Sequence, residues 1–175
     1  MSALPHKSLA HVSLIQLDAV VLAVPQSNLH TVESVLDIKP AHDARAAGYI
    51  ELHGEEWPVY SPTDNLVPVA EMTGDHRTCA MLISGDSLFG LMCREVINAD
   101  AAQLKAFKLP ECMRTPDTPL YGVGLLGKRV ICLTSAPSLH ALFTAEYSRD
   151  DAGVTGTQSR RGDRGPVTDT TEASA

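Results

Sequence analysis

The apolar residues of this chain come in short runs, and Gly, Pro, Asn, Asp or Ser interrupts the chain between one run and the next. Short runs rich in Val, Ile and Leu predict β-strands, and the turn residues between them predict hairpins. The predicted strands and extended segments are residues 11–17, 20–24, 31–38, 48–52, 57–60, 78–83, 88–93, 94–99, 121–126 and 128–133. This spacing is typical of small barrels or sandwiches, so the sequence predicts a mostly β fold.

Helical character is limited to a few short segments. Residues 29–36 also fit a helical pattern, as an alternative to an extended one. Residues 61–64 (SPTD) are typical of a helix start, although Pro68 leaves room for only about one turn. A short helix is predicted over residues 137–143. None of these segments predicts a large helical layer.

The composition changes at residue 148. From there to residue 175 Gly, Ser, Thr, Asp and Arg dominate, and large apolar side chains are nearly absent. Such a segment buries too little surface to offset its chain entropy, which predicts a disordered tail. We therefore expect a flexible N-terminus over residues 1–10, a folded domain over residues 11–147 and a disordered tail over residues 148–175.

The charge and hydropathy of the chain argue against two classes of partner. The formal net charge of −7 over 175 residues disfavours nonspecific binding to nucleic acid or to an anionic membrane, because either needs a basic face. No apolar run has the length needed to cross a bilayer, and the N-terminal segment lacks the apolar stretch of a signal peptide. We therefore expect a cytoplasmic protein without membrane insertion.

The cysteines and histidines do not have the spacing of metal ligands. The cysteines are Cys79, Cys93, Cys112 and Cys132. They form no C-x-x-C pair, and all but Cys112 lie in apolar runs, which favours buried reduced thiols over a zinc site. The histidines are His6, His11, His30, His42, His53, His76 and His140, and they form no H-E-x-x-H motif. We expect no metal and no cofactor.

Residues 122–129 read GVGLLGKR, which contains a G-x-G-x-x-G fingerprint and most of a P-loop. Both motifs need a helix after the glycines to receive the phosphates, but the sequence continues as a predicted strand and then reaches Pro137. Arg129 also stands where the P-loop has its magnesium-binding hydroxyl. The glycines therefore predict a hairpin turn at Gly127 and no nucleotide site.

Four stretches follow one another in an order that resembles a known family. They are LAVPQSNLHTVESVLDI, GYIELHGEEWPVYSPTDNL, CAMLISGDSLFGLMCREV and YGVGLLGKRVICLTSAPSLHALF. Together they span about residues 11–145 and resemble the CheW family of adaptor domains in bacterial chemotaxis-type signalling. The matching positions are Val32, Glu33, Val35, Gly48, Ile50, Leu52, Gly54, Pro58, Val59, Leu66, Gly85, Gly90, Leu91 and Val96.

The resemblance implies a CheW-like fold of two intertwined five-stranded barrels similar to SH3 domains, with a hydrophobic groove between them. It also implies a noncatalytic adaptor without a cofactor. The implied partners are the regulatory domain of a CheA-type histidine kinase, the cytoplasmic tip of a methyl-accepting chemoreceptor and other CheW-like adaptors. By resemblance, the partner-binding residues are Val32, Glu33, Val35, Leu36, His53 and Gly54.

Three departures from the family pattern indicate a divergent adaptor. His53 stands where the family usually has Arg, and an imidazole cannot supply a permanently charged fork. Arg94 replaces the usual Asp, and Thr134 with Ser135 replaces Leu-Asp at the end of the last strand. We expect an adaptor of a type IV pilus system, which drives twitching motility, or of another non-flagellar array.

Two further points concern the surface of the domain. Trp57 and Tyr60 are candidate binding anchors, although packing of Trp57 inside a barrel is the favoured interpretation. The alternative function is a small β-barrel ligand-binding module or minor enzyme. It would use the cleft between the barrels, with His53 or Cys93 as a candidate reactive group.

Overall fold

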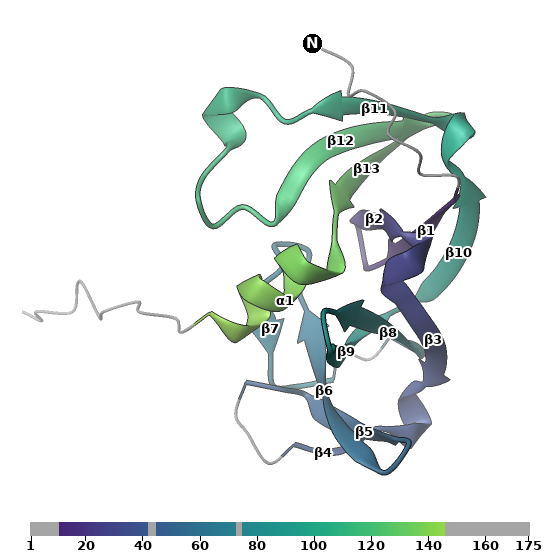
Figure 1. Ribbon diagram of the computed structural model, residues 1–175, viewed down its shortest axis with the longest axis vertical. Coiled ribbons are helices and arrows are strands. Elements are labelled where there is room, and N and C mark those ends of the chain that lie inside the picture. Colours follow the sequence, from purple (N-terminus) through teal and green to yellow (C-terminus); the bar gives the residue numbers. More distant parts are fainter. Residues whose placement is uncertain (1–10, 42–44, 73–74, 146–175) are drawn as a thin grey trace, which may run out of the picture. The chain divides into compact units, whose positions relative to one another are not determined.

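The computed structural model describes residues 11–41, 45–72 and 75–145. Two curled, mostly antiparallel sheets, one α-helix and a few 3-10 turns make up this part of the chain (Figure 1). The segments predicted to be flexible, residues 1–10 and 148–175, lie outside the described residues.

The first sheet combines strands from both ends of the described chain, and we call it the terminal barrel. Its strands are β1 (His11–Gln16), β2 (Val21–Pro25), β10 (Glu95–Asp100), β11 (Leu104–Lys108), β12 (Leu120–Leu126) and β13 (Arg129–Thr134). Their spatial order is β10-β1-β2-β13-β12-β11. The two strands at the ends of this order, β10 and β11, are joined only by the 3-10 turn η3 (Ala101–Gln103), so they act as one bent strand that closes the sheet.

The second sheet uses the middle of the chain, and we call it the central barrel. Its strands are β3 (Leu29–Ser34), β4 (Lys39–Pro40), β5 (Gly48–Leu52), β6 (Glu55–Pro62), β7 (Pro68–Val69), β8 (Thr78–Ser84) and β9 (Ser87–Cys93). The order is β3-β8-β9-β6-β5-β4, with β7 added beside β6. Here the 3-10 turn η2 (Val35–Asp37) joins β3 to β4 as a second bent strand.

The two barrels exchange their hairpins. Along the chain, the hairpin β1–β2 precedes the meander β3/β4–β5–β6, and the hairpin β8–β9 precedes the meander β10/β11–β12–β13. The first hairpin pairs with the second meander through the parallel strands β2 and β13, and the second hairpin pairs with the first meander through β9 and β6. With each bent strand counted once, each barrel has five principal strands, and the prediction of two small intertwined barrels is confirmed.

One hydrophobic core lies in each barrel, and a larger core lies between them. The helix α1 (Ala136–Thr144) belongs to the shared core: its Leu139 and Phe143 are buried there, and Phe143 stacks on Tyr60 of β6 with ring centroids 5.0 Å apart. Ser135 caps the helix by accepting a hydrogen bond from the Ser138 backbone N–H. The shared core joins the two barrels into one packed unit.

Most predicted elements agree with the structure. The hairpin at Gly127 is confirmed, because β12 and β13 flank it, Gly127 has a φ of 61°, and the chain continues directly as a strand and not as a helix. The helix predicted to start at residues 61–64 is wrong, because β6 continues through Pro62 and pairs there with β7. The extended prediction for residues 31–38 holds to Ser34, after which the chain forms η2.

The short connections complete the element list. They are η1 (Gln26–Asn28) and η4 (Glu111–Met113).

The two candidate anchor residues differ in their exposure. Tyr60 is buried against Phe143, so its prediction as a binding anchor is wrong. Trp57 is half-buried against the core of the central barrel, in agreement with the packing interpretation.

Candidate functional site

Strand β3 presents one face of side chains to the exterior. Exposed and half-buried residues alternate along it, as expected for a strand with one face on a barrel. Val32 lies on the exposed face and Glu33 is half-buried. On the next turn the backbone N–H of Leu36 donates a hydrogen bond to the Ser34 hydroxyl, which closes η2 and leaves Leu36 90% exposed. Val35 turns inward and packs against the central-barrel core.

The turn between β5 and β6 lies beside β3. His53 and Gly54 both have positive φ, 56° and 84°, as a two-residue type I′ turn requires. Glycine takes this conformation without strain, whereas His53 is held in it by the flanking pairs of the hairpin. The imidazole rings of His53 and His30 meet edge to face, with centroids 6.3 Å apart. The predicted residues of β3 and of this turn therefore belong to one region of the central barrel.

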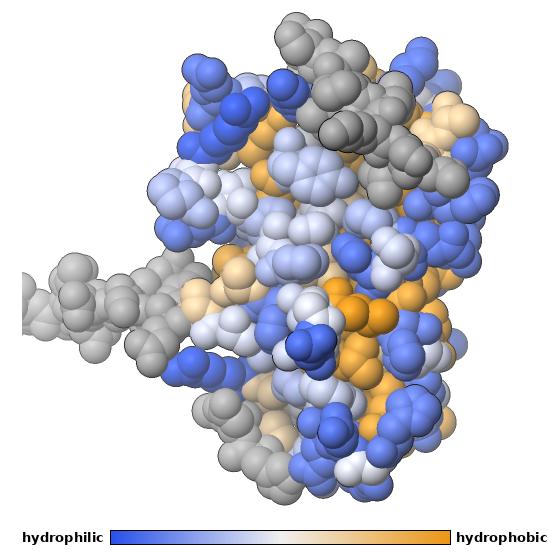
Figure 2. Space-filling view, viewed as in Figure 1, coloured by the Kyte–Doolittle hydropathy of each residue, from blue (hydrophilic) through white to orange (hydrophobic). Residues whose placement is uncertain are grey.

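A shallow groove of about 480 Å³ crosses this region. It is lined by Glu33, Leu36, Asp37, Ile38, Lys39, Ile50, Glu51 and Leu52. Apolar side chains form part of its lining and three carboxylates supply negative charge, so we call it the acidic groove. In Figure 2, orange surface lies between blue side chains over the half of the molecule that holds β3 and β8. Such mixed surfaces are typical of protein-binding sites.

One ion pair organises the acidic groove. The Lys39 ammonium lies 2.7 Å from the Glu51 carboxylate and 5.7 Å from the centre of the Tyr49 ring. The hydrogen bond and charge of Lys39 lower the pKa of Glu51, and the same contact raises the pKa of Lys39. Both side chains are about half exposed, so the pair orients Glu51 more than it adds stability.

The sequence prediction found only part of this groove. It identified Glu33 and Leu36, but it missed Asp37, Lys39 and Glu51. These residues meet because Lys39 pairs with Tyr49 across β4 and β5, a pairing that only the closed barrel creates. The sequence held one indirect signal: Lys39 and Glu51 carry opposite charges and flank a segment that is predicted to be a connection.

The departures from the family pattern have local structural roles. Arg94 links the two barrels between β9 and β10: its guanidinium lies 3.4 Å from the Asp75 carboxylate, and its backbone N–H donates to the Gln16 carbonyl of the terminal barrel. The buried Thr134 hydroxyl donates to the Pro119 carbonyl at 2.8 Å, and Ser135 caps α1. Thr134 and Ser135 therefore replace a Leu-Asp pair with hydrogen bonds that hold the last helix.

Three of the four cysteines lie in or against the hydrophobic cores, whereas Cys112 is exposed. Cys79 and Cys93 are fully buried. Burial raises the pKa of the Cys93 thiol to about 12 and also raises the pKa of Cys79 and Cys132. A thiol that stays protonated at neutral pH is a poor nucleophile. Within residues 11–41, 45–72 and 75–145, no group of three His, Cys, Asp or Glu side chains is placed to hold a metal ion.

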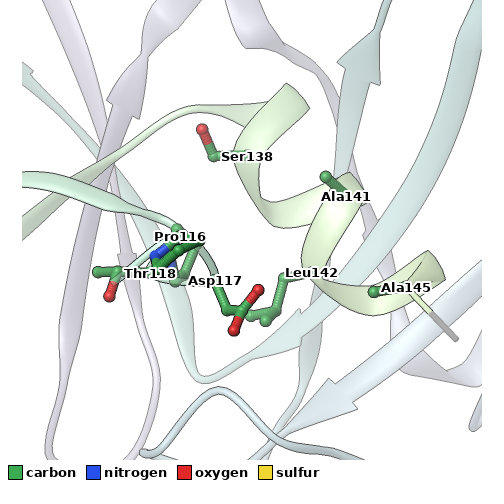
Figure 3. A pocket seen from close by; sticks show the side chains of 8 residues that line it. Pro116, Asp117, Thr118, Ser138, Ala141, Leu142 and Ala145 are labelled. Carbon is green, nitrogen blue, oxygen red and sulfur yellow. The ribbon is translucent and has the colours of Figure 1, made fainter. Parts of the chain in front are cut away.

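A second pocket, of about 290 Å³, lies between α1 and the loop before β12 (Figure 3). Its lining consists of Pro116, Asp117, Thr118, Pro119, Ser138, Ala141, Leu142 and Ala145. Asp117 is its single carboxylate, so the lining offers no acid–base pair for catalysis.

In the described part of the chain, no helix has the length and apolar character needed to span a bilayer.

Comparisons with known proteins agree with this architecture. No protein-family model matches the chain, and no curated protein matches it by sequence. Among solved structures, the chain is similar to the scaffolding protein TtCheW from Thermoanaerobacter tengcongensis. The TM-score is 0.54 at 18% sequence identity, over 74% of this chain and 91% of the other. The fold is CheW-like. At this identity the likeness establishes the fold alone, and the CheW-like fold predicted from the four sequence stretches is confirmed.

Proposed function

We propose that this protein is a noncatalytic adaptor that couples chemoreceptors to a CheA-type histidine kinase. The observation that carries the proposal is the CheW-like fold, shared with a protein described as a scaffold, together with the acidic groove beside β3. In this proposal the partner-binding residues are Val32, Glu33, Leu36, His53 and Gly54. Val35 supports them from the core of the barrel. The adaptor works in the cytoplasm.

The physical features of the groove support binding rather than catalysis. Leu36 offers an exposed apolar anchor, and a leucine that becomes buried on binding contributes about 1.5–3 kcal/mol. Glu33, Asp37 and Glu51 surround it and would steer a basic or mixed-charge partner into place. Backbone groups at the edges of a sheet offer further pairing sites.

His53 adjusts how the partner is recognised. It lies exposed in the β5–β6 turn, at the position where the family pattern has Arg. A neutral imidazole forms one directional hydrogen bond, whereas a guanidinium forms a charged bidentate contact. We propose that this change tunes the adaptor to a non-flagellar partner set, such as the array of a pilus that drives twitching motility.

The rival hypothesis, a ligand-binding module or minor enzyme, has weaker support. Its candidate nucleophile Cys93 is fully buried with a pKa raised to about 12. The ring that His53 meets is another imidazole, that of His30, which does not orient it as a general base in the way that a carboxylate would. The scaffold hypothesis is therefore the better supported of the two.

A binding measurement with the regulatory domain of the cognate CheA-type kinase tests the proposal. We expect saturable binding, and we expect Leu36→Asp to weaken it at least tenfold, because a charge would replace the exposed anchor. Met113→Asp is the matched control: Met113 is also an exposed apolar residue, but it lies in η4 of the terminal barrel. Absence of binding to the kinase domain and to receptor tips, combined with a small molecule that raises the melting temperature, would favour the rival.

A further inference from the structure

The open end of the terminal barrel beside the β1–β2 turn is surrounded by polar side chains. Side chains alternate between the two faces of a strand, and Leu14 of β1 and Ile131 of β13 face the core of this barrel. Gln16 and Arg129 lie two residues away on the same faces of these strands. Glu95 pairs with Gln16 across β10 and β1, so its side chain lies on the same side of the sheet. The inward rows of three strands therefore end on polar residues at one mouth of the barrel.

A pocket of about 440 Å³ occupies this mouth, and we call it the mouth pocket. Its lining comes from the end of β1, the β1–β2 turn, the β9–β10 junction and the start of β13, and consists of Gln16, Asp18, Arg94, Glu95 and Arg129. Two guanidiniums and two carboxylates give this lining a formal charge of zero. The mouths of small barrels are common sites for small ligands. The mouth pocket has room for a small polar molecule.

Glu95 and Arg129 stand on opposite walls of the mouth pocket. Because β10 and β11 form one of the five principal strands of the closed barrel, β10 and β13 lie across the barrel from each other. Among the described residues, neither Glu95 nor Arg129 takes part in an ion pair. Both residues are exposed to solvent. Charges of opposite sign on the two walls of a concave site are placed to bind a ligand that carries both signs.

The other three lining residues hold the walls of the mouth pocket in place. The Arg94 guanidinium lies 3.4 Å from the Asp75 carboxylate, and the Asp18 carboxylate lies 3.6 Å from Nε2 of the buried His76. The Gln16 Nε2 donates to the backbone carbonyls of the two residues that follow it, at 3.1 and 3.2 Å. Its Oε1 remains as a hydrogen-bond acceptor. The mouth pocket therefore has a fixed frame around its two opposing charges.

We propose that the mouth pocket binds a small zwitterion of the α-amino acid class. The carboxylate of the ligand accepts hydrogen bonds from the Arg129 guanidinium, and its ammonium group donates to the Glu95 carboxylate. The Gln16 Oε1 offers the ammonium group a second acceptor. A simple anion or a simple cation contacts only one wall, whereas a zwitterion contacts both. The mouth pocket shares no lining residue with the acidic groove, so this proposal does not depend on the adaptor function.

NMR titration of the isotope-labelled full chain tests the site, with glycine, L-serine and L-glutamine as zwitterionic probes. We expect saturable shifts of the backbone amides of Asp18, Glu95 and Arg129. Acetate and methylammonium each carry one of the two charges, and we expect them to bind at least tenfold more weakly. Added salt should weaken zwitterion binding, because the contacting charges are exposed. If all three zwitterions leave these amides unshifted, the proposal is wrong, and equal binding of acetate or methylammonium excludes a zwitterion as the ligand class.

Variants that remove one charge locate the ligand. Arg129→Gln and Glu95→Gln are each expected to weaken binding at least tenfold, because each removes the partner of one charge of the ligand. Lys105→Gln and Glu111→Gln are the matched controls: they remove one exposed cation and one exposed anion outside the mouth pocket. Both controls should bind like the unmodified protein. Equal binding by all four variants would place the ligand elsewhere and contradict the proposal.

Further measurements separate folding and the adaptor function from this result. Circular dichroism melting verifies that each variant is folded. Arg129→Lys keeps a cation without the guanidinium fork and should bind more tightly than Arg129→Gln. An equal loss in these two variants would mean that the charge at this position does not bind the carboxylate. Kinase binding by Arg129→Gln should equal that of the unmodified protein, because Arg129 lies outside the acidic groove. A chain that binds zwitterions at the mouth pocket but binds no kinase would overturn only the adaptor proposal.

Discussion

Two hairpins, β5–β6 and β12–β13, hold the same place in the two barrels, and their outer faces have diverged. Each has a two-residue turn, and the second pair from each turn points outward. In the central barrel this pair is Glu51 and Glu56, and in the terminal barrel it is Leu125 and Val130. One repeated hairpin thus presents carboxylates in one barrel and branched apolar side chains in the other.

The inward positions of the same hairpins differ in volume but not in character. Ile50 and Trp57 face the core of the central barrel, whereas Gly124 and Ile131 face that of the terminal barrel. The Leu104 side chain fills the space over Gly124, where an added Cβ would lie 2.7 Å from its Cδ1. Interior packing therefore restricts what each hairpin can carry inside, while the exterior is free to specialise for partners.

The first prediction tests whether the two barrels are independent. Phe143 of α1 lies in the shared core against Tyr60 and Phe89. We expect Phe143→Ala to lower the free energy of unfolding by about 3–5 kcal/mol, in one transition that includes both barrels. Urea unfolding followed by circular dichroism and by Trp57 fluorescence measures this. Two separate transitions would mean that the barrels are coupled only weakly.

The second prediction exchanges an inward residue between the hairpins. Gly124→Ile gives the terminal barrel the residue that Ile50 supplies in the central barrel. Because Leu104 and Leu133 already occupy the space, we expect a loss of about 1–3 kcal/mol in urea unfolding. Adding Leu104→Ala should recover part of the loss. A stable single variant would show that the two interiors are interchangeable.

Local patterns in the sequence predicted the elements well, and long-range pairing limited the prediction of the site. The Gly127 hairpin follows from its own residues and the strand-forming run after it. The contact of Lys39 with Glu51 depends on closure of a barrel through η2. The failed helix start at residues 61–64 has the same cause, because Pro62 is held in β6 by its pairing with β7. The family resemblance supplied the topology that local propensity lacks.

The third prediction exchanges the outward residues. In the double variant Leu125→Glu with Val130→Glu, the terminal hairpin copies the outer pair of the central one, and Lys105 lies beside residue 125 as a counter-charge. We expect stability to change by less than about 1 kcal/mol in urea unfolding, because both positions are exposed. A large loss of stability would show that Leu125 and Val130 belong to the folded core.

The smallest effect concerns the like-charged pair of the central hairpin. Glu51 and Glu56 lie opposite each other, and the Lys39 ammonium compensates their repulsion through its 2.7 Å contact with Glu51. Because this contact lowers the pKa of Glu51 in the folded protein, its stabilising effect is present above the unfolded-state pKa of the carboxyl. It is lost as the pH falls through the folded-state value. Lys39→Gln should raise the pKa of Glu51, as measured by NMR titration of its side-chain carboxyl, whereas Lys105→Gln should leave it unchanged. An unshifted Glu51 pKa in the Lys39 variant would mean that the ion pair does not persist in solution and that Lys39 does not compensate the repulsion between Glu51 and Glu56.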